Sequence, residues 1–420
     1  MKSNQMFYGW KIVFGAVLVL SVTGPAGVAI ANIYQNAVTD ALNISSSQFS
    51  ISNILILSVS VLLSSWVSSL LAKNFKKVFL IGSLIFGSLI YGLAYMSFGL
   101  VTNVWMFYLL SIIVGFGFLT TSAMTMSILI STWFIEKRGL ALSIALAGLG
   151  VGGIIWSPIV TSLIHSIGWR ATYMTYGAIM LIITLGIGQF IFVSKPKDKN
   201  LEALGTVHSN NHNDHDAKFN SRVPFTMQES LHKPFFILLL LGAIFVGLAN
   251  NAGLGQFPPF MQSLHGPQQG AVIISVYSAI GILGKLSMGI IADKLGTVSA
   301  TIWSSILLAF AYFLAASTTS YGFAILIAIL FGLGNANATV LVPLLISAIF
   351  SAQTSTRVFG LVNQFLFLGM MFGSFMAASI AEATAYTIAW YIFVAISLSI
   401  IVLWGIAYLL AKKDFKVIKK

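Results

Sequence analysis

The chain contains no cysteine among its 420 residues. Disulfide bridges, thiolate metal sites and cysteine nucleophiles are therefore excluded. Charge is scarce as well, because only 8% of the residues are Asp, Glu, Lys or Arg, whereas about 25% is usual in a soluble domain. So few ionic groups cannot cover the surface of a soluble fold of this length.

Hydrophobic residues make up 58% of the chain, and its mean hydropathy is +0.94. This composition excludes a soluble enzyme, a disordered protein and a disulfide-bonded scaffold. The formal net charge of +12 would suggest a nucleic-acid partner in a soluble protein. Here the basic residues lie in short segments between apolar runs, so the excess reflects membrane topology, and we expect no nucleic-acid partner.

The apolar runs are long enough to cross a membrane, since a spanning helix needs about 20 mainly apolar residues. Spans are predicted near 10–36, 47–72, 77–99, 103–132, 140–166, 171–194, 234–262, 270–292, 297–317, 321–350, 357–384 and 386–411. The sequence thus predicts an all-α membrane protein with twelve transmembrane helices in two pseudo-symmetric six-helix halves.

One long polar segment, residues 195–233, divides these spans. We therefore expect an N-terminal six-helix bundle over 1–194, a cytoplasmic linker over 195–233 and a C-terminal six-helix bundle over 234–420. The linker contains His208, His212 and His215. A solvated linker is the preferred interpretation, and a metal-binding tract is the alternative.

Lys and Arg are distributed unequally between the two sides of the predicted membrane. With a cytoplasmic N-terminus, the outside loops hold Arg170 as their fixed cation. The inside then holds the linker cations together with Lys2, Lys11, Lys73, Lys76, Lys77, Lys137, Arg138, Lys294, Arg357 and the tail from Lys412 to Lys420. Because positive charge favours the cytoplasmic side, this pattern predicts a multi-pass protein of the cell membrane with both termini in the cytoplasm.

Two six-span halves joined by a cytoplasmic linker resemble the major facilitator superfamily (MFS) over the whole chain. The superfamily's loop signature, G-x-x-x-D-[RK]-x-G, is matched from Gly289 to Gly296, with Asp293 and Lys294 at the charged positions. The counterpart after the second span, residues 69–77, has neither the Gly nor the Asp. The resemblance implies that Gly289, Asp293, Lys294 and Gly296 form a gating loop.

A narrower resemblance covers spans four and five. The stretch Trp133-Phe134-Ile135-Glu136-Lys137-Arg138-Gly139-Leu140-Ala141, with the Gly-rich run 147–153, is similar to the W-F-x-x-[KR]-R-G-x-A region of the oxalate/formate antiporter and monocarboxylate transporter branch. This resemblance implies an organic anion as substrate. We include Arg138 among the gating residues, together with the loop from Gly289 to Gly296.

The glycines of residues 148–153 suggest a dinucleotide-binding loop at first sight, but no strand precedes them and they lie inside an apolar segment. Small residues at helical spacing allow two membrane helices to approach closely. Gly115, Gly117, Gly332 and Gly334 fit the same interpretation. Sliding surfaces and plain close packing both remain open. No P-loop is present, and we expect no cofactor.

Lys285 is the one charged residue deep inside a predicted span. It lies eight residues before Asp293, or about 12 Å along a helix. A cation at the helix centre costs about 2.5–3.5 kcal/mol. Ser278, Gly281 and Gly289 share its face, and a small, partly polar face suits a cavity better than lipid. A functional cation is preferred over the alternative, a lysine that reaches the membrane surface.

The resemblance supports this interpretation, because monocarboxylate and oxalate/formate transporters carry a substrate-binding Arg in the matching helix, where this chain has Gly284-Lys285. The predicted span that ends near Glu382 has no second cation, so a monoanion is expected rather than a dianion. The Asp that often precedes the cation by one turn is replaced by Gly281. Lys, unlike Arg, can release its proton, so proton symport through Lys285 and anion exchange without protons both remain open.

Further polar residues inside the spans are weaker candidates for substrate contacts, since each can also bond neighbouring helices. The seventh span has Asn251 and Gln256, followed by Pro258 and Pro259, which predict a break or bend. The substrate-binding set that we predict is Lys285, Tyr277, Ser278, Gly281, Asn251, Gln256, Tyr34, Asn335 and Asn363.

The sequence therefore predicts a secondary active transporter that moves a small organic anion, a monocarboxylate, by alternating access. An MFS transporter for a bile acid, sugar or drug is the alternative. An enzyme is not expected, because no catalytic constellation converges within the spans. The expected partners are the organic anion, protons as the candidate coupling ion, and the lipid bilayer. We expect a monomer.

Overall fold

The computed structural model describes residues 7–27, 30–73, 77–121, 123–134, 138–204, 227–350 and 352–418. Within these ranges a further group of side chains is not described, including those of residues 64–81 and 351–357. The helices form two compact units. Unit 1 comprises residues 1–43 and 58–213, and unit 2 comprises residues 44–57 and 214–420.

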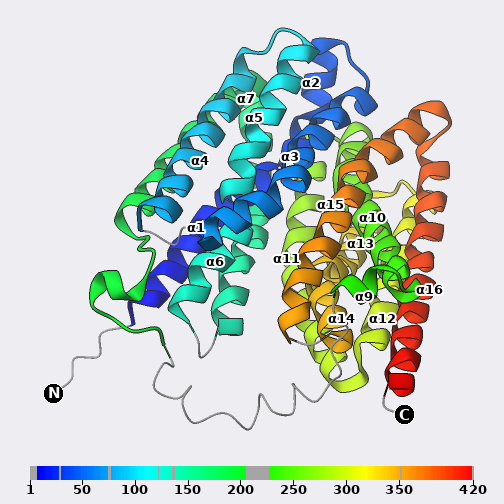
Figure 1. Ribbon diagram of the computed structural model, residues 1–420. Helices are drawn as coiled ribbons and strands as arrows, with labels where there is room; N and C mark the ends of the chain where they lie inside the picture. The colour runs from blue at the N-terminus through cyan, green and yellow to red at the C-terminus, as the bar shows by residue number, and fades with distance from the viewer. Residues whose placement is uncertain are drawn as a thin grey trace. The chain divides into compact units, whose positions relative to one another are not determined.

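Unit 1 is built from helices that run side by side (Figure 1). In chain order its elements are α1 (Tyr8–Gly27), η1 (Ala31–Tyr34), α2 (Gln35–Leu42), the second part of α3 (Ser46–Lys73), α4 (Lys77–Ser97), η2 (Phe98–Leu100), α5 (Val104–Thr121), α6 (Ala123–Trp133), α7 (Arg138–Phe190) and η3 (Pro196–Lys199).

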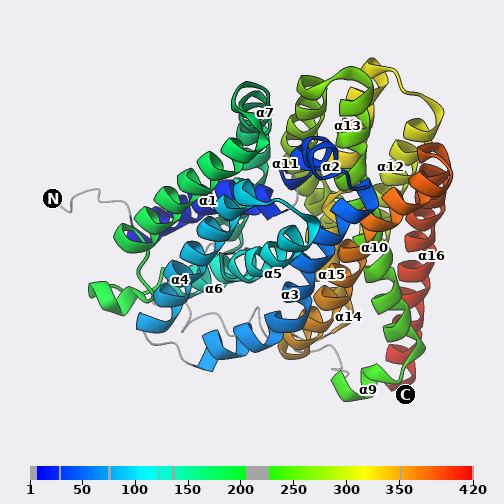
Figure 2. The same cartoon turned by 90° about the horizontal axis from the view of Figure 1, so that it is seen from above.

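Unit 2 begins with the first part of α3 and continues after the linker. Its elements are α9 (Met227–Leu231), α10 (Pro234–His265), α11 (Pro267–Leu295), α12 (Thr297–Ser317), α13 (Tyr321–Gly334), the π-helical turn η5 (Asn337–Leu341), α14 (Val342–Ile349), α15 (Ala352–Ala383) and α16 (Tyr386–Ile418). Figure 2 shows α10, α15 and α16 beside one another from a second direction.

The predicted all-α membrane fold is confirmed, because each predicted span is mainly helical among its described residues. Ten helical segments in the described part of the chain are long and apolar enough to cross a membrane. One of them, Leu140–Phe190, has 51 residues, which would extend about 77 Å as one helix. It is divided at Gly168, whose φ of 79° is non-helical. This glycine therefore separates the predicted fifth and sixth spans.

Within the residues that the structure describes, the first and the tenth predicted spans are interrupted. The first ends as α1 at Gly27, shortly after Pro25, and the chain continues through η1 into α2. The tenth is divided by the π-helical turn between α13 and α14. Interruptions of this kind free backbone groups and are common near functional sites of membrane helices.

The break predicted at Pro258 and Pro259 is absent, because α10 continues through both residues to His265. Packing on two sides supports this part of the helix. Ser374 of α15 lies against Gly255, and the carbonyl of Pro258 faces Gly270 of α11. The neighbouring helices therefore hold the helical path although each proline removes a backbone donor.

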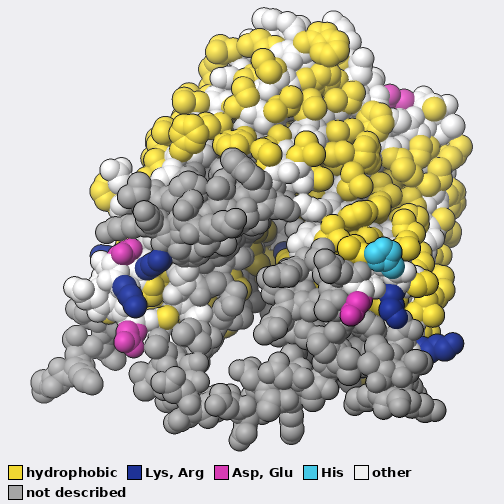
Figure 3. Space-filling model, viewed as in Figure 1, with side chains coloured by type: hydrophobic (Ala, Val, Ile, Leu, Met, Phe, Trp, Pro, Cys, Tyr) yellow, Lys and Arg dark blue, Asp and Glu magenta, His cyan; other side chains and the backbone are white. Residues whose placement is uncertain are grey.

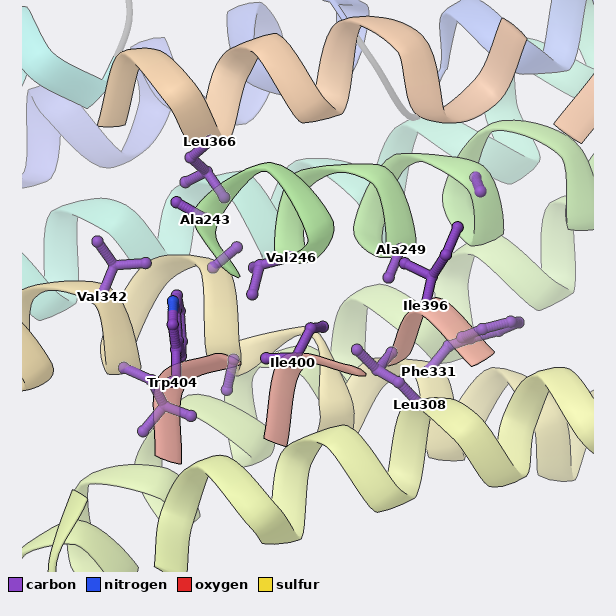
Figure 4. Close-up of a cluster of buried hydrophobic side chains, with 14 of the residues drawn as sticks. Ala243, Val246, Ala249, Leu308, Phe331, Val342, Leu366, Ile396, Ile400 and Trp404 are labelled. Carbon is purple, nitrogen blue, oxygen red and sulfur yellow. The ribbon is translucent and has the colours of Figure 1, made fainter. Parts of the chain in front are cut away.

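The core of unit 2 lies where α10, α12, α13, α14, α15 and α16 converge (Figure 4). Trp404 is almost fully buried and its indole N–H donates to the carbonyl of Leu239 over 3.2 Å. Gly242 faces the indole ring so closely that a Cβ atom would overlap it. The large indole ring of Trp404 therefore fills the space on α10 that Gly242, which has no side chain, leaves open.

The residues that follow α7, including the start of the linker, pack against one end of unit 1. Trp133, from the motif that carried the narrower resemblance, is buried and donates through its indole N–H to the carbonyl of Val193 over 2.9 Å. Phe134 forms an isolated parallel bridge with Leu204. The motif thus anchors the residues that follow α7 against the end of α6.

Pairs of glycines place α7 against α1 in unit 1 and α15 against α10 in unit 2. In unit 1, Gly148 and Gly152 lie on the backbone carbonyls of Val17 and Ser21. The contact is so close that a Cβ atom on either glycine would overlap the partner backbone.

Unit 2 repeats this arrangement with Gly369 and Gly373, which lie on the carbonyls of Ile244 and Leu248. In both units the two glycines are four residues apart and so occupy one helix face. Close packing therefore accounts for Gly148 and Gly152, and the repeat relates the two units although their sequences differ.

Hydrophobic side chains cover most of the visible surface of the described residues (Figure 3). Large apolar residues such as Trp105, Ile182 and Phe190 are exposed. The Lys and Arg side chains visible in this view lie mainly in its lower half (Figure 3). An apolar surface of this extent requires lipid rather than water around it.

Candidate functional site

Lys285 lies in α11, a regular helix bounded by two glycines. Gly266, which precedes it, has a φ of 101°, and Gly296, which follows it, has a φ of 90°. Left-handed backbone at these positions suits glycine and lets the chain reverse between neighbouring helices. Lys285 is partly buried, and it makes no hydrogen bond or ion pair with any residue that the structure describes.

The α11 backbone next to Lys285 crosses α13 without intervening side chains. A Cβ atom on Gly284 would lie 2.8 Å from the carbonyl oxygen of Gly332 and 2.9 Å from the Cα atom of Leu333. Gly281 faces the same Gly332 carbonyl at 3.8 Å. The small face predicted around Lys285 is therefore used in part for this crossing, and the lysine leaves α11 directly beside it.

A buried amide pair joins α10 to the π-helical turn. Asn250 donates from Nδ2 to Asn337 Oδ1 over 2.8 Å and to the carbonyl of Val246 over 2.8 Å. The other two amide atoms, Asn250 Oδ1 and Asn337 Nδ2, are buried and have no hydrogen-bond partner among the described residues. One acceptor and one donor thus remain unsatisfied at the start of the turn.

The amide pair gives a prediction for stability. Asn337→Leu should destabilise the protein by about 1–3 kcal/mol, because the buried Asn250 amide loses one of its two acceptors and keeps only its bond to the carbonyl of Val246. The double variant Asn250→Leu/Asn337→Leu should lose less than the sum of the two single variants. Thermal unfolding of all four proteins in detergent measures this coupling. Strictly additive losses would contradict it.

Other predicted contact residues already bond to neighbouring helices. Asn251 donates from Nδ2 to the carbonyl of Met370 over 2.5 Å. Gln256 is fully buried and donates from Nε2 to Ser374 Oγ over 2.9 Å, while its Oε1 accepts from Tyr386 over 3.1 Å. Both amides therefore connect α10 to its neighbours within unit 2.

Tyr34, the predicted contact in the first span, lies in η1 of unit 1. Its ring stacks on Tyr173 with 3.7 Å between the ring centroids, and its hydroxyl is buried without a partner among the described residues. Tyr95 has the same unpartnered hydroxyl and packs edge-on against Tyr173. These tyrosines form an aromatic cluster inside unit 1, whereas Lys285 belongs to unit 2.

The remaining predicted residues differ in exposure. Ser278 is buried, and Tyr277, Asn335 and Asn363 are partly buried. Among the gating residues, Lys294 is exposed near the end of α11, and Gly296 forms the turn to α12. The side chains of Asp293 and Arg138 and the surroundings of Gly289 lie outside the described part of the chain, and the linker residues His208, His212 and His215 do as well.

A polar cluster that the sequence did not predict surrounds the beginning of α3. The Glu382 carboxylate accepts from the backbone N–H and the hydroxyl of Ser47, each over 2.6 Å. Ser50 Oγ accepts from Gln256 Nε2 over 3.0 Å and lies 3.4 Å from Ser374 Oγ.

The sequence did contain a signal for the start of α3. Ser45 Oγ accepts from the N–H of Gln48, and Gln48 Oε1 accepts from the N–H of Ser45. This is a capping box, which is visible as S-x-x-Q before an apolar run.

Comparison with known proteins identifies the family. The family model "Major Facilitator Superfamily" matches residues 12–265 and 239–419, which together cover most of the chain. The chain belongs to the Major Facilitator Superfamily, a class of membrane transporters that carry small molecules.

Curated relatives are distant. An uncharacterised MFS-type transporter of Escherichia coli, YhjX, is 24% identical over 168 residues, which are 40% of this chain and 38% of that protein. Monocarboxylate transporter 12 of Xenopus laevis is 22% identical over 198 residues, 44% of this chain and 42% of that protein. The chain therefore aligns with less than half of the length of these two relatives.

Solved structures share the fold. A bacterial homologue of the human lysosomal transporter Spinster, in an inward-facing and occupied conformation, has a TM-score of 0.70 and 16% identity, with 98% of both chains covered. A nucleoside transporter has a TM-score of 0.73 and 12% identity over 95% of this chain and 99% of its own. At these identities the likeness establishes the fold alone.

Proposed function

We propose that the protein is a secondary active transporter for a small organic monoanion, a monocarboxylate, and that Lys285 binds the carboxylate. The observation that carries the proposal is a lysine in the middle of a membrane helix with no partner among the described residues. An ammonium group in such surroundings attracts an anion strongly, because little water screens the charge.

The proposed cycle is alternating access between a half made of residues 1–194 and a half made of residues 234–420. Both termini are proposed to lie in the cytoplasm, and the active form is proposed to be a monomer. Lys285 would bind one negative charge when the site is open to one side and release it on the other. The monocarboxylate transporter among the relatives and the motif around Trp133 support an organic anion of the oxalate/formate and monocarboxylate type.

The coupling is proposed to be proton symport or anion exchange. In symport, Lys285 takes up a proton with the anion and releases both on the other side. In exchange, Lys285 keeps its charge and a second anion returns through the empty site. Position 281, one turn before Lys285, holds a glycine and no carboxylate. In this scheme Lys285 therefore carries the proton on its own face of α11.

A second candidate is transport of another substrate class. One fungal relative, which is 27% identical over 172 residues, is named as an efflux protein for fujikurins. For an uncharged substrate, Lys285 would have no direct role. The response of transport to substitution of Lys285 therefore separates the two candidates.

Uptake into proteoliposomes tests the proposal. Radiolabelled formate and L-lactate are offered with oxalate as a dianion and uridine as a neutral comparison, each at several imposed pH gradients and with or without internal anion. We expect uptake of a monoanion above protein-free liposomes. Stimulation by an inward proton gradient supports symport, and stimulation by internal anion supports exchange. Uptake of uridine without uptake of any anion would contradict the proposal.

A further inference from the structure

A groove lies on the surface of unit 2 between α10 and α16, which run side by side (Figure 2). Its lining consists of Leu241 and Phe245 of α10 and of Ser399, Val402 and Leu403 of α16. Its volume is about 290 Å³, far more than the roughly 30 Å³ of one water molecule. This space is called the α10–α16 groove.

The lining of the groove is apolar in character. Ser399 is its one polar residue, and the hydroxyl of Ser399 donates to the carbonyl of Ala395 over 2.8 Å within α16. Leu241 and Val402 are exposed. The groove therefore suits a hydrocarbon chain, which needs no hydrogen-bond partner.

The two helices run in opposite directions, so the start of α10 and the end of α16 lie at the same end of unit 2. Trp404 donates to the carbonyl of Leu239 near this end. Phe260, near the other end of α10, packs against Tyr386 at the start of α16 with 4.4 Å between the ring centroids. Lys233, directly before α10, and Lys413, near the end of α16, are therefore at one end together.

On α10 an exposed strip connects the groove to Lys233. Leu241, Ile237 and Lys233 follow one another at intervals of four residues and so share one helix face. Ile237 is exposed and Lys233 is partly exposed. Lys233 also precedes the first turn of α10, where the helix dipole adds partial positive charge.

On α16 a second strip leads from the groove to Lys413. Val402, Ile406, Leu409 and Lys413 are spaced by four, three and four residues, which is the repeat of one helix face. All four side chains are exposed. Each helix thus presents exposed apolar residues beside the groove and a lysine where the apolar residues end.

The positive charge at this end exceeds the negative charge. Among the described side chains of α9, the start of α10 and the end of α16, Lys233, Lys412, Lys413 and His232 accompany one acid, Glu229. This excess complements a ligand that carries net negative charge.

The spacing between the lysines and the groove matches the depth of a membrane leaflet. Leu241 lies eight residues from Lys233, or about 12 Å along the helix, and Val402 lies eleven residues from Lys413, or about 17 Å. Half of the hydrocarbon core is about 15 Å thick. A phosphate held between the two lysines would therefore place its acyl chain at the groove.

We propose that unit 2 binds an anionic phospholipid here, with one acyl chain in the α10–α16 groove and the headgroup phosphate at Lys233 and Lys413. A zwitterionic phospholipid binds more weakly, because its own ammonium or choline group cancels the charge that the lysines attract. The site is separate from Lys285 and is independent of the transported substrate.

The lack of cysteine allows a site-specific test. Leu241→Cys carries a bimane fluorophore in the groove, and the full chain is reconstituted in phosphatidylcholine vesicles. Phosphatidylglycerol or phosphatidylcholine with brominated acyl chains is then added in increasing mole fraction, because bromine quenches bimane on contact. Ile306→Cys is the reference, since Ile306 is exposed on α12 at a similar distance from the start of its helix and does not line the groove.

Brominated phosphatidylglycerol should quench the label at position 241 half-maximally at a mole fraction at least fivefold lower than brominated phosphatidylcholine, about the effect of one lysine near a membrane surface. At position 306 the two lipids should differ by less than about twofold. Sodium phosphate at the same ionic strength as sodium chloride should leave the quenching at position 241 unchanged.

Lys233→Gln/Lys413→Gln should abolish the preference for phosphatidylglycerol at position 241. Lys197→Gln/Lys199→Gln is the matched control, because it removes the same charge from two exposed lysines of unit 1; it should leave the preference intact. If the first double variant does not reconstitute, Lys413→Gln alone, at an exposed position, should reduce the preference at least twofold.

Equal preferences at positions 241 and 306 would overturn the proposal, since the anionic lipid would then only collect around the whole protein. A preference that survives loss of the lysines would overturn it too. Displacement of the brominated lipid by sodium phosphate would assign the lysines to free phosphate instead. The readout requires no transport, so its result and that of the uptake assay are independent.

Discussion

Lys285→Gln should reduce uptake of the transported monoanion about 100-fold, measured as kcat/KM in proteoliposomes. The substitution keeps a polar side chain of similar length and removes the positive charge. Loss of a charge-assisted bond of about 1.5–3 kcal/mol corresponds to a decrease of roughly 10- to 150-fold. Folding should be preserved, because Lys285 makes no bond to a described residue and its charge opposes burial in the membrane.

Lys285→Arg is the matched variant, because it keeps the positive charge. It should retain measurable anion uptake, although the larger side chain beside the α11–α13 crossing lowers the rate. Arg stays protonated under all working conditions. If Lys285 carries the proton, uptake by Lys285→Arg should no longer respond to an imposed pH gradient. Anion uptake by Lys285→Gln at the parent rate would remove Lys285 from the site and favour a neutral substrate.

Gly369→Ala should destabilise the protein by about 2–3 kcal/mol and lower its Tm by roughly 5 °C. The added Cβ atom would overlap the carbonyl of Ile244, which is backbone and cannot move aside as a side chain would. The helices α10 and α15 would have to separate, and Gly373 would lose its contact with α10 as well. The measurement is thermal unfolding of detergent-purified protein, combined with its size-exclusion profile.

Gly405→Ala is the control for this substitution. Gly405 lies in α16, and a Cβ atom there would meet no heavy atom within 4 Å. Alanine favours a helix over glycine by about 1 kcal/mol, so this variant should be as stable as the parent or slightly more stable. A Gly369→Ala protein with the parent's Tm would show that α10 and α15 do not approach as closely as described.

The sequence was informative about the helices because a membrane span depends on a local property. A run of about 20 apolar residues satisfies its own backbone groups as a helix, so the spans followed from the printed residues. The separation of the fifth and sixth spans between residues 166 and 171 followed in the same way, and the structure places the break at Gly168. The capping box at Ser45 and Gln48 was equally readable.

The site was predicted only in part. Lys285 was identified because a charged residue within an apolar run can be recognised without knowing what it contacts. In the structure it has no partner among the described residues. Gln256 and Asn251 were selected by the same polar criterion, yet their amides bond to Ser374 and Met370. Whether a polar residue is free or bonded depends on the helix that lies opposite, and no local pattern encodes that.

By itself the sequence determined that this chain is an all-helical membrane protein with one intramembrane lysine, because hydropathy and charge act residue by residue. Only the tertiary structure decided which glycines face a backbone carbonyl, that α10 passes unbroken through Pro258 and Pro259, and that the first turns of α3 belong with α15 and Glu382. Each of these depends on contacts between residues that are far apart in the chain. Such contacts form only when the helices pack, since packing determines which side chains meet.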